Sequence, residues 1–172
     1  MLRRDGNTSI AVERDSLMTA RHSIGTALLV LLTVAGAMAQ ATNPLVGSWK
    51  LNPAKSKNLA YTAGTTTVEA VGAGIKMTAD LSGPGAAKAH WSFTANYDGK
   101  DMPATGNSPY GDTVSLARVD ERTTRVTVKQ AGKVTVTQTI VVSADGKTRT
   151  TTTKGVDAAG KPVDSVSLYE RQ

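Results

Sequence analysis

The feature that most constrains the fold is a succession of short segments in which apolar and polar residues alternate. About ten such segments follow one another after residue 44, with no helical pattern between them. Alternation with a period of two is typical of strands that bury one face. In the clearest case, the segment 88–97, the residues that share the apolar face are Ala89, Trp91, Phe93, Ala95 and Tyr97. The pattern predicts an all-β protein.

Turns of one repeated kind separate these segments. A small or acidic residue, a glycine and a lysine occupy residues 98–100, 131–133, 145–147 and 159–161. Glycine can adopt the positive φ that a tight hairpin requires, and hairpins pair each strand antiparallel with its sequence neighbours. We therefore expect an antiparallel up-and-down β-barrel of about 8–10 strands, because closure removes unpaired strand edges. A β-sandwich is the alternative architecture.

A barrel with this many strands is too wide for its own side chains to fill, so a cavity is expected. The threonine-rich run at 147–154 is strand-like by its β-branched residues but polar on both faces. It is therefore either an edge strand or a strand whose inner face lines a wet cavity. Other segments have one clear apolar face, and alternation predicts that these residues point inward: Ile75, Met77, Ala79, Leu81, Val114, Leu116, Val126, Val128, Val134, Val136, Ile140 and Val142.

The N-terminal region resembles a targeting segment. Residues 24–39 form a charge-free run of 16 residues, which is short for a membrane span of about 20. Arg21 precedes the run and small-x-small sites ending at Ala39 and Ala41 follow it, as in a secretory signal. We predict that residues 1–41 are an N-terminal signal cleaved near Ala39 or Ala41, with a retained anchor as the alternative. Residues 42–172 then form one exported domain, periplasmic or extracellular, without a stable membrane anchor.

The first 17 residues carry both acidic and basic side chains, whereas the start of a signal is short and basic. We therefore expect translation to begin at Met18. The chain has a net charge of +6, but its positive residues are spread singly rather than in a basic stripe with stacking aromatics. This distribution argues against a nucleic-acid partner.

The residues that most often carry chemistry are sparse. The chain has no cysteine, and His90 is the only histidine left after the predicted cleavage. Alternation places His90 on the face opposite Trp91 and Phe93, so it is expected to point to solvent. No catalytic constellation, metal site or cofactor is predicted, and we expect a monomer without enzymatic activity.

Two stretches carry a resemblance to a known family. Gly47-Ser48-Trp49 resembles the opening G-x-W strand of lipocalins and fatty-acid-binding proteins, the calycin group. The turn at 145–147, the threonine-rich strand after it and the terminal segment 168–171 are similar to the last hairpins of the fatty-acid-binding type. The chain is also similar to small exported bacterial lipocalin-like proteins. The resemblance implies a barrel closed by Gly47 and Trp49, with a small hydrophobic or amphipathic ligand inside.

The chain departs from the fatty-acid-binding pattern at two places. Residues 52–64 are too few for the helical lid of those proteins. Tyr169 fits the tyrosine of their carboxylate-binding Arg-x-Tyr pair, but Ser167 stands at the arginine position. Arg118 shares a face with Val114 and Leu116, so it is expected either to enter the cavity or to cap its rim.

The sequence therefore predicts an exported protein that carries or sequesters a small apolar or amphipathic, lipid-like molecule. The alternative is a filled barrel that serves as a structural or interaction module without a small ligand. The predicted ligand-binding residues are Met77, Trp91, Phe93, Leu116, Arg118, Val128, Ile140 and Tyr169.

Overall fold

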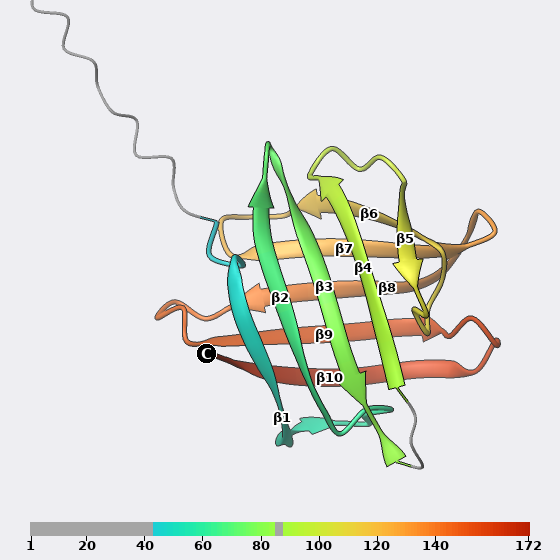
Figure 1. Cartoon of the computed structure of the whole chain (residues 1–172), viewed down its shortest axis with the longest axis horizontal. Helices are drawn as coiled ribbons and strands as arrows, with labels where there is room; N and C mark the ends of the chain where they lie inside the picture. The colour runs from blue at the N-terminus through green and yellow to red at the C-terminus, as the bar shows by residue number, and fades with distance from the viewer. Residues whose placement is uncertain (1–42, 85–87) are drawn as a thin grey trace, which may run out of the picture. The chain divides into compact units, whose positions relative to one another are not determined.

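Ten strands follow one another along the chain, and each pairs with its neighbours in sequence (Figure 1). The computed structural model describes residues 43–84 and 88–172, so the predicted signal segment lies outside the described residues. Within the described part, no helix is long and apolar enough to cross a membrane. The strands are β1 (Gly47–Lys57), β2 (Ala63–Val71), β3 (Gly74–Ser82), β4 (Lys88–Asn96), β5 (Met102–Gly106), β6 (Thr113–Arg118), β7 (Thr123–Gln130), β8 (Lys133–Val142), β9 (Thr148–Val156) and β10 (Pro162–Arg171).

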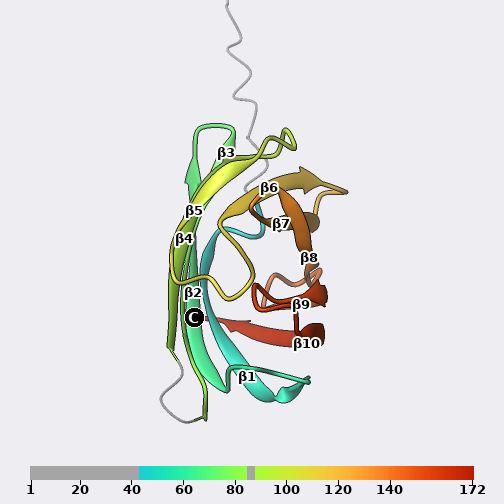
Figure 2. The same ribbon diagram turned by 90° about the vertical axis from the view of Figure 1, so that its right-hand side faces the viewer.

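The first and last strands close the barrel. β1 pairs antiparallel with β2 on one side and with β10 on the other, and every remaining strand pairs with its sequence neighbours. Figure 2 shows β2, β3 and β4 facing β7–β10 across the interior. The predicted up-and-down barrel is confirmed and the sandwich alternative is excluded. β1 continues to Lys57, so no helical lid separates it from β2.

The predicted turns have the expected backbone geometry. Gly99, Gly132, Gly146 and Gly160 all have positive φ angles, between 68° and 84°. Asp98 accepts a hydrogen bond from the backbone N–H of Lys100 at 3.1 Å, and Asp145 accepts one from that of Lys147 at 3.0 Å. Such bonds stabilise both the turn and the charged carboxylate. The bond from Lys100 lowers the pKa of Asp98, and hydrogen bonds from the Ser143 hydroxyl and then from Lys147 lower the pKa of Asp145.

Alternation predicted most of the inner face correctly, with one exception in β8. Val136, Ile140 and Val142 are buried, but Val134 is 57% exposed. The register between β7 and β8 shifts beside Lys129, which pairs with Val134, whereas Val128 pairs with Val136. Because one extra residue enters the strand at this irregularity, the alternation changes phase there.

Trp49 and Arg171 close one end of the barrel. The Trp49 side chain is fully buried, and its indole N–H donates a hydrogen bond to the carbonyl of Leu45 at 2.9 Å. The Arg171 guanidinium lies over the indole, with Cζ 4.2 Å from the ring centroid. A Cβ at position 47 would lie 2.3 Å from Nη1 of Arg171, so Gly47 provides the space that the guanidinium occupies.

Arg171 also joins two separate backbone segments, the stretch 44–46 and the turn at Gly146. Its guanidinium donates hydrogen bonds of 2.7 Å to the carbonyls of Pro44, Val46 and Gly146. We expect Arg171→Met to lower the free energy of unfolding by about 1.5–3 kcal/mol, the scale of hydrogen bonds made by a charged donor. Chemical denaturation of the wild type and the variant measures this difference.

Arg171→Lys is the matched control for this variant. Lysine keeps the charge but lacks the planar fork that lets arginine reach several acceptors together. We therefore expect the lysine variant to recover only a small part of the lost stability. Full recovery would show that charge alone matters and would contradict a role for the three carbonyl contacts.

Candidate functional site

The barrel contains an inner chamber of about 60 Å³. The chamber is large enough for several waters, each of which needs roughly 10–15 Å³, or for one small polar group. Its wall is mixed, and none of its described lining residues carries a carboxylate, an imidazole, an amine or a thiol. They are Leu51, Leu59, Ala60, Tyr61, Thr66, Met77, Leu81, Trp91, Tyr110, Gln138, Ile140, Arg149, Thr151, Thr153, Ser165, Ser167 and Tyr169.

Among the described residues that line the chamber, Arg149 is the one that carries a charge, and it is 3% exposed. It pairs in register with Tyr169 across β9 and β10, and its guanidinium Cζ lies 4.1 Å from the centroid of the tyrosine ring. The Trp49 ring centroid is 5.5 Å from the same atom. Among the described residues, none of the ion pairs includes Arg149. The aromatic faces are therefore its nearest electrostatic support.

Burial lowers the pKa of Arg149 to about 10, and interactions with Tyr169 oppose part of this effect. Because this value is still well above neutral pH, the guanidinium keeps its charge inside the barrel. A buried charge without an opposite charge is costly. Arg149 is therefore a buried cation that no carboxylate among the described residues compensates.

Unsatisfied hydrogen-bond donors gather around the same chamber. Among the described residues, the buried side-chain polar atoms without a partner belong to Trp91, Arg149 and Thr151, all of which line the chamber. The atoms are the indole Nε1, the guanidinium Nε and Nη1, and the hydroxyl Oγ1. The three nitrogens can only donate, and the hydroxyl can also donate. The chamber is therefore suited to a group that carries hydrogen-bond acceptors.

The threonine-rich strand β9 supplies much of the polar wall. β9 pairs with β8 on one side and β10 on the other, so it is not an edge strand. Its inward residues are Arg149, Thr151 and Thr153, and Thr153 accepts a hydrogen bond from the amide of the buried Gln138 at 3.2 Å. Of the two interpretations that the sequence left open, the polar cavity wall is the one observed.

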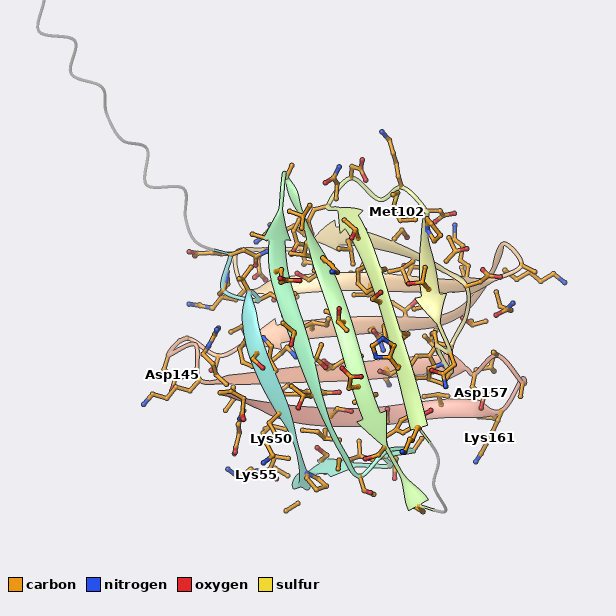
Figure 3. All side chains as sticks on the ribbon, viewed as in Figure 1. Lys50, Lys55, Met102, Asp145, Asp157 and Lys161 are labelled. Atoms are coloured by element: carbon orange, nitrogen blue, oxygen red, sulfur yellow. The ribbon has the colours of Figure 1, made fainter. Side chains whose placement is uncertain are left out.

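A larger cavity of about 520 Å³ lies at the end of the barrel opposite Trp49. Figure 3 shows Asp157 and Lys161, which belong to its rim, at the far end of β9 from the turn that carries Asp145. We call this cavity the vestibule. Apolar parts of its lining come from Leu59, Pro109, Pro162 and Val163.

The vestibule and the inner chamber are adjacent, because five residues line both: Leu59, Ala60, Tyr61, Tyr110 and Ser165. We call these residues the collar. Burial raises the pKa of Tyr110 to about 12, so its hydroxyl is neutral over the physiological range. The collar is therefore uncharged and separates the buried guanidinium from the charged rim.

The structure divides the predicted ligand-binding residues into three groups. Met77, Trp91, Ile140 and Tyr169 line the inner chamber. Phe93, Leu116 and Val128 are buried in the hydrophobic core but do not line either cavity. Trp91 and Phe93 stack on each other with ring centroids 5.8 Å apart, so Phe93 supports the chamber wall from the core.

Arg118, the third group, lies outside both cavities. It is exposed, its Cζ lies 4.2 Å from the centroid of Tyr97, and Nη1 reaches the carbonyl of Glu121 at 3.5 Å. Although Arg118 follows Val114 and Leu116 on one face, β6 ends at this residue. Of the two positions expected for Arg118, entry into the cavity is therefore not observed, and the side chain lies beside the 120–121 turn.

Sequence reasoning did not select Arg149, although the sequence carried a weak signal. Arg149, Thr151 and Thr153 alternate with Thr150 and Thr152, so an inward threonine face would also bring the arginine inward. Because both faces of this strand are polar, alternation could not identify the inner one.

The remaining polar clusters lie on the surface. His90 is exposed as predicted, and its Nδ1 lies 2.5 Å from a carboxylate oxygen of Asp80. Among residues 43–84 and 88–172, no group of three or more His, Cys, Asp or Glu side chains is arranged to hold a metal ion.

The described residues form a closed antiparallel up-and-down barrel of ten strands. This architecture is consistent with calycin-like folds, as the resemblance at both ends implied. In comparisons of sequence and fold, the chain matches no protein-family model, no curated protein and no solved structure.

Proposed function

We propose that this protein is an exported, calycin-like binding protein that carries or sequesters a small amphipathic molecule in its barrel. The single observation that carries the proposal is the inner chamber, where unsatisfied donors of Trp91, Arg149 and Thr151 converge next to an accessible vestibule. A purely structural core would gain by replacing such donors with apolar side chains.

The composition of the two cavities supports an amphipathic rather than a purely apolar ligand. The chamber offers hydrogen-bond donors and a positive charge, whereas the vestibule adds apolar surface from Leu59, Pro109, Pro162 and Val163. Binding pockets commonly combine apolar walls with a few converging polar groups in this way. The apolar run at residues 24–39 supports export.

Co-purification tests the proposal directly. The wild type, Arg149→Met and Arg118→Met would be purified under native conditions, extracted with solvent and analysed by mass spectrometry for small molecules. Both variants remove one positive charge, but only Arg149 lines the chamber. We expect one molecule to be enriched with the wild type and Arg118→Met, and to be strongly reduced with Arg149→Met.

Two other outcomes would contradict the proposal. If all three proteins yield no bound molecule and none binds added amphiphiles, the barrel is a structural or interaction module. If Arg118→Met loses the molecule as fully as Arg149→Met, binding depends on net charge or on the outer surface rather than on the chamber.

A further inference from the structure

We propose that the loop 107–112, between β5 and β6, is a gate that controls entry to the inner chamber, with the Tyr110 side chain as its plug. This inference rests on the proposed function and adds how the proposed site is opened and closed. We call this loop the strap. Figure 2 shows the strap reaching from β5 into the space between β4 and the wall formed by β8 and β9.

The first end of the strap is fixed to β4 through Asn107. The backbone N–H of Asn107 donates a hydrogen bond to the carbonyl of His90 at 2.9 Å, and its side-chain oxygen accepts one from the N–H of His90 at 2.6 Å. The side-chain amide of Asn107 donates to the carbonyl of Lys88 at 2.9 Å. These three bonds extend the pairing of β4 beyond the end of β5 and hold the start of the strap in place.

The second end of the strap is fixed to β7 and the β7–β8 turn through Asp112. Its N–H donates to the carbonyl of Lys129 at 2.9 Å, and its own carbonyl accepts a bond from the N–H of Ala104 at 2.8 Å. Its carboxylate accepts bonds from the Gln130 side chain at 3.0 Å and from the Ala131 N–H at 3.1 Å. The part of the strap that can move without breaking either attachment is therefore residues 108–111.

The middle of the strap is held to the opposite wall far less firmly than its ends. The N–H of Ala158, in the β9–β10 turn, donates a hydrogen bond to the carbonyl of Pro109 at 3.0 Å. Among residues 43–84 and 88–172, this is the one backbone hydrogen bond that joins residues 108–111 to that turn. Because proline has no N–H, Pro109 cannot donate a second. Surface loops held by few hydrogen bonds open locally while the rest of the fold stays intact.

Tyr110 connects the movement of the strap to the chamber. Its side chain lines both the chamber and the vestibule, and Tyr61 of the β1–β2 connection lines both as well. The residue before Tyr110 carries the carbonyl that Ala158 holds, so release of that bond frees Tyr110 to withdraw. Withdrawal would join the chamber of about 60 Å³ to the vestibule of about 520 Å³. Since no helical lid separates β1 from β2, the strap supplies the cover of this end of the barrel.

Acrylamide quenching of tryptophan fluorescence in the full chain tests the gate, because Trp91 lines the chamber. Every protein carries Trp49→Phe, which leaves Trp91 as the only tryptophan. Pro109→Cys and Ala158→Cys are introduced together, and the chain has no other cysteine. The two positions are direct neighbours, as a disulfide requires. We expect the oxidised pair to lower the quenching constant by about fivefold or more relative to the reduced pair, because the disulfide removes the open state.

Tyr110→Ala tests the same gate without a disulfide. Loss of the plug should raise the quenching constant of Trp91 by about twofold or more, because the chamber then stays open to the vestibule. Tyr97→Ala is the matched control, since Tyr97 lines neither cavity, and it should leave the quenching constant unchanged.

Equal quenching of the oxidised and reduced pair, or an unchanged value for Tyr110→Ala, would overturn the gate. Because the probe is acrylamide, this result does not depend on a natural ligand. A gated chamber in a protein that yields no co-purified molecule and binds no added amphiphile would reject the proposed function alone. An ungated chamber in a protein that retains a co-purified molecule would reject the gate alone.

Discussion

Trp49→Ala should lower the free energy of unfolding by about 3–5 kcal/mol, the usual cost of removing a fully buried aromatic side chain. Trp49 is 0% exposed, and its N–H is bonded to the Leu45 carbonyl. The substitution would also remove the surface on which Arg171 rests. Because the described domain has no cysteine, its stability depends on the core, and this loss is a large share of about 5–15 kcal/mol.

Denaturant unfolding followed by circular dichroism measures the loss as a lower midpoint with an unchanged slope. Trp49→Phe is the matched control, because phenylalanine keeps an aromatic ring but cannot donate to Leu45. We expect Trp49→Phe to lower the free energy of unfolding by clearly less than Trp49→Ala. An unchanged midpoint for Trp49→Ala would show that the side chain does not close the barrel.

A second substitution is expected to stabilise the protein rather than to destabilise it. Arg149→Met should raise the free energy of unfolding of the ligand-free barrel by about 1–4 kcal/mol, the range seen when buried charges are replaced by apolar residues of similar volume. The guanidinium is charged at neutral pH and pairs with no carboxylate among the described residues, so the folded wild type retains its desolvation cost. Methionine would fill similar space without that cost.

Arg149→Lys is the control, since lysine keeps a buried charge that is more strongly hydrated in the unfolded chain. We expect no gain in stability from lysine. A loss of stability in Arg149→Met, measured by the same denaturant unfolding, would show that stacking on Tyr169 and Trp49 outweighs desolvation. Arg149 would then be a structural residue, and its burial would leave no energetic cost for a ligand to offset.

Local patterns in the sequence were sufficient for the barrel itself. Successive side chains of a strand point to opposite faces, so residues such as Trp91 and Ile140 could be assigned inward from alternation alone. The turn glycines could be recognised because positive φ is a local property of the backbone. Antiparallel neighbours and closure follow from short hairpins that leave no spare edge.

Alternation was less informative about position along the barrel axis. Arg118 and Leu116 share a face, but the strand ends at Arg118. Leu116 is therefore buried, whereas Arg118 is exposed. Val134 was assigned to the wrong face, because a register irregularity between β7 and β8 cannot be seen in β8 alone.

The sequence by itself determined the class of fold, the turns and most of the core, because each depends on residues close together in the chain. Only the tertiary structure decided that Arg149 lies inside, since both faces of β9 are polar and the pairing with β8 and β10 orients the strand. It also brought Arg149 of β9 next to Trp49 of β1, two strands that are far apart in sequence. The candidate site is a product of this non-local pairing, which no periodicity within a single strand encodes.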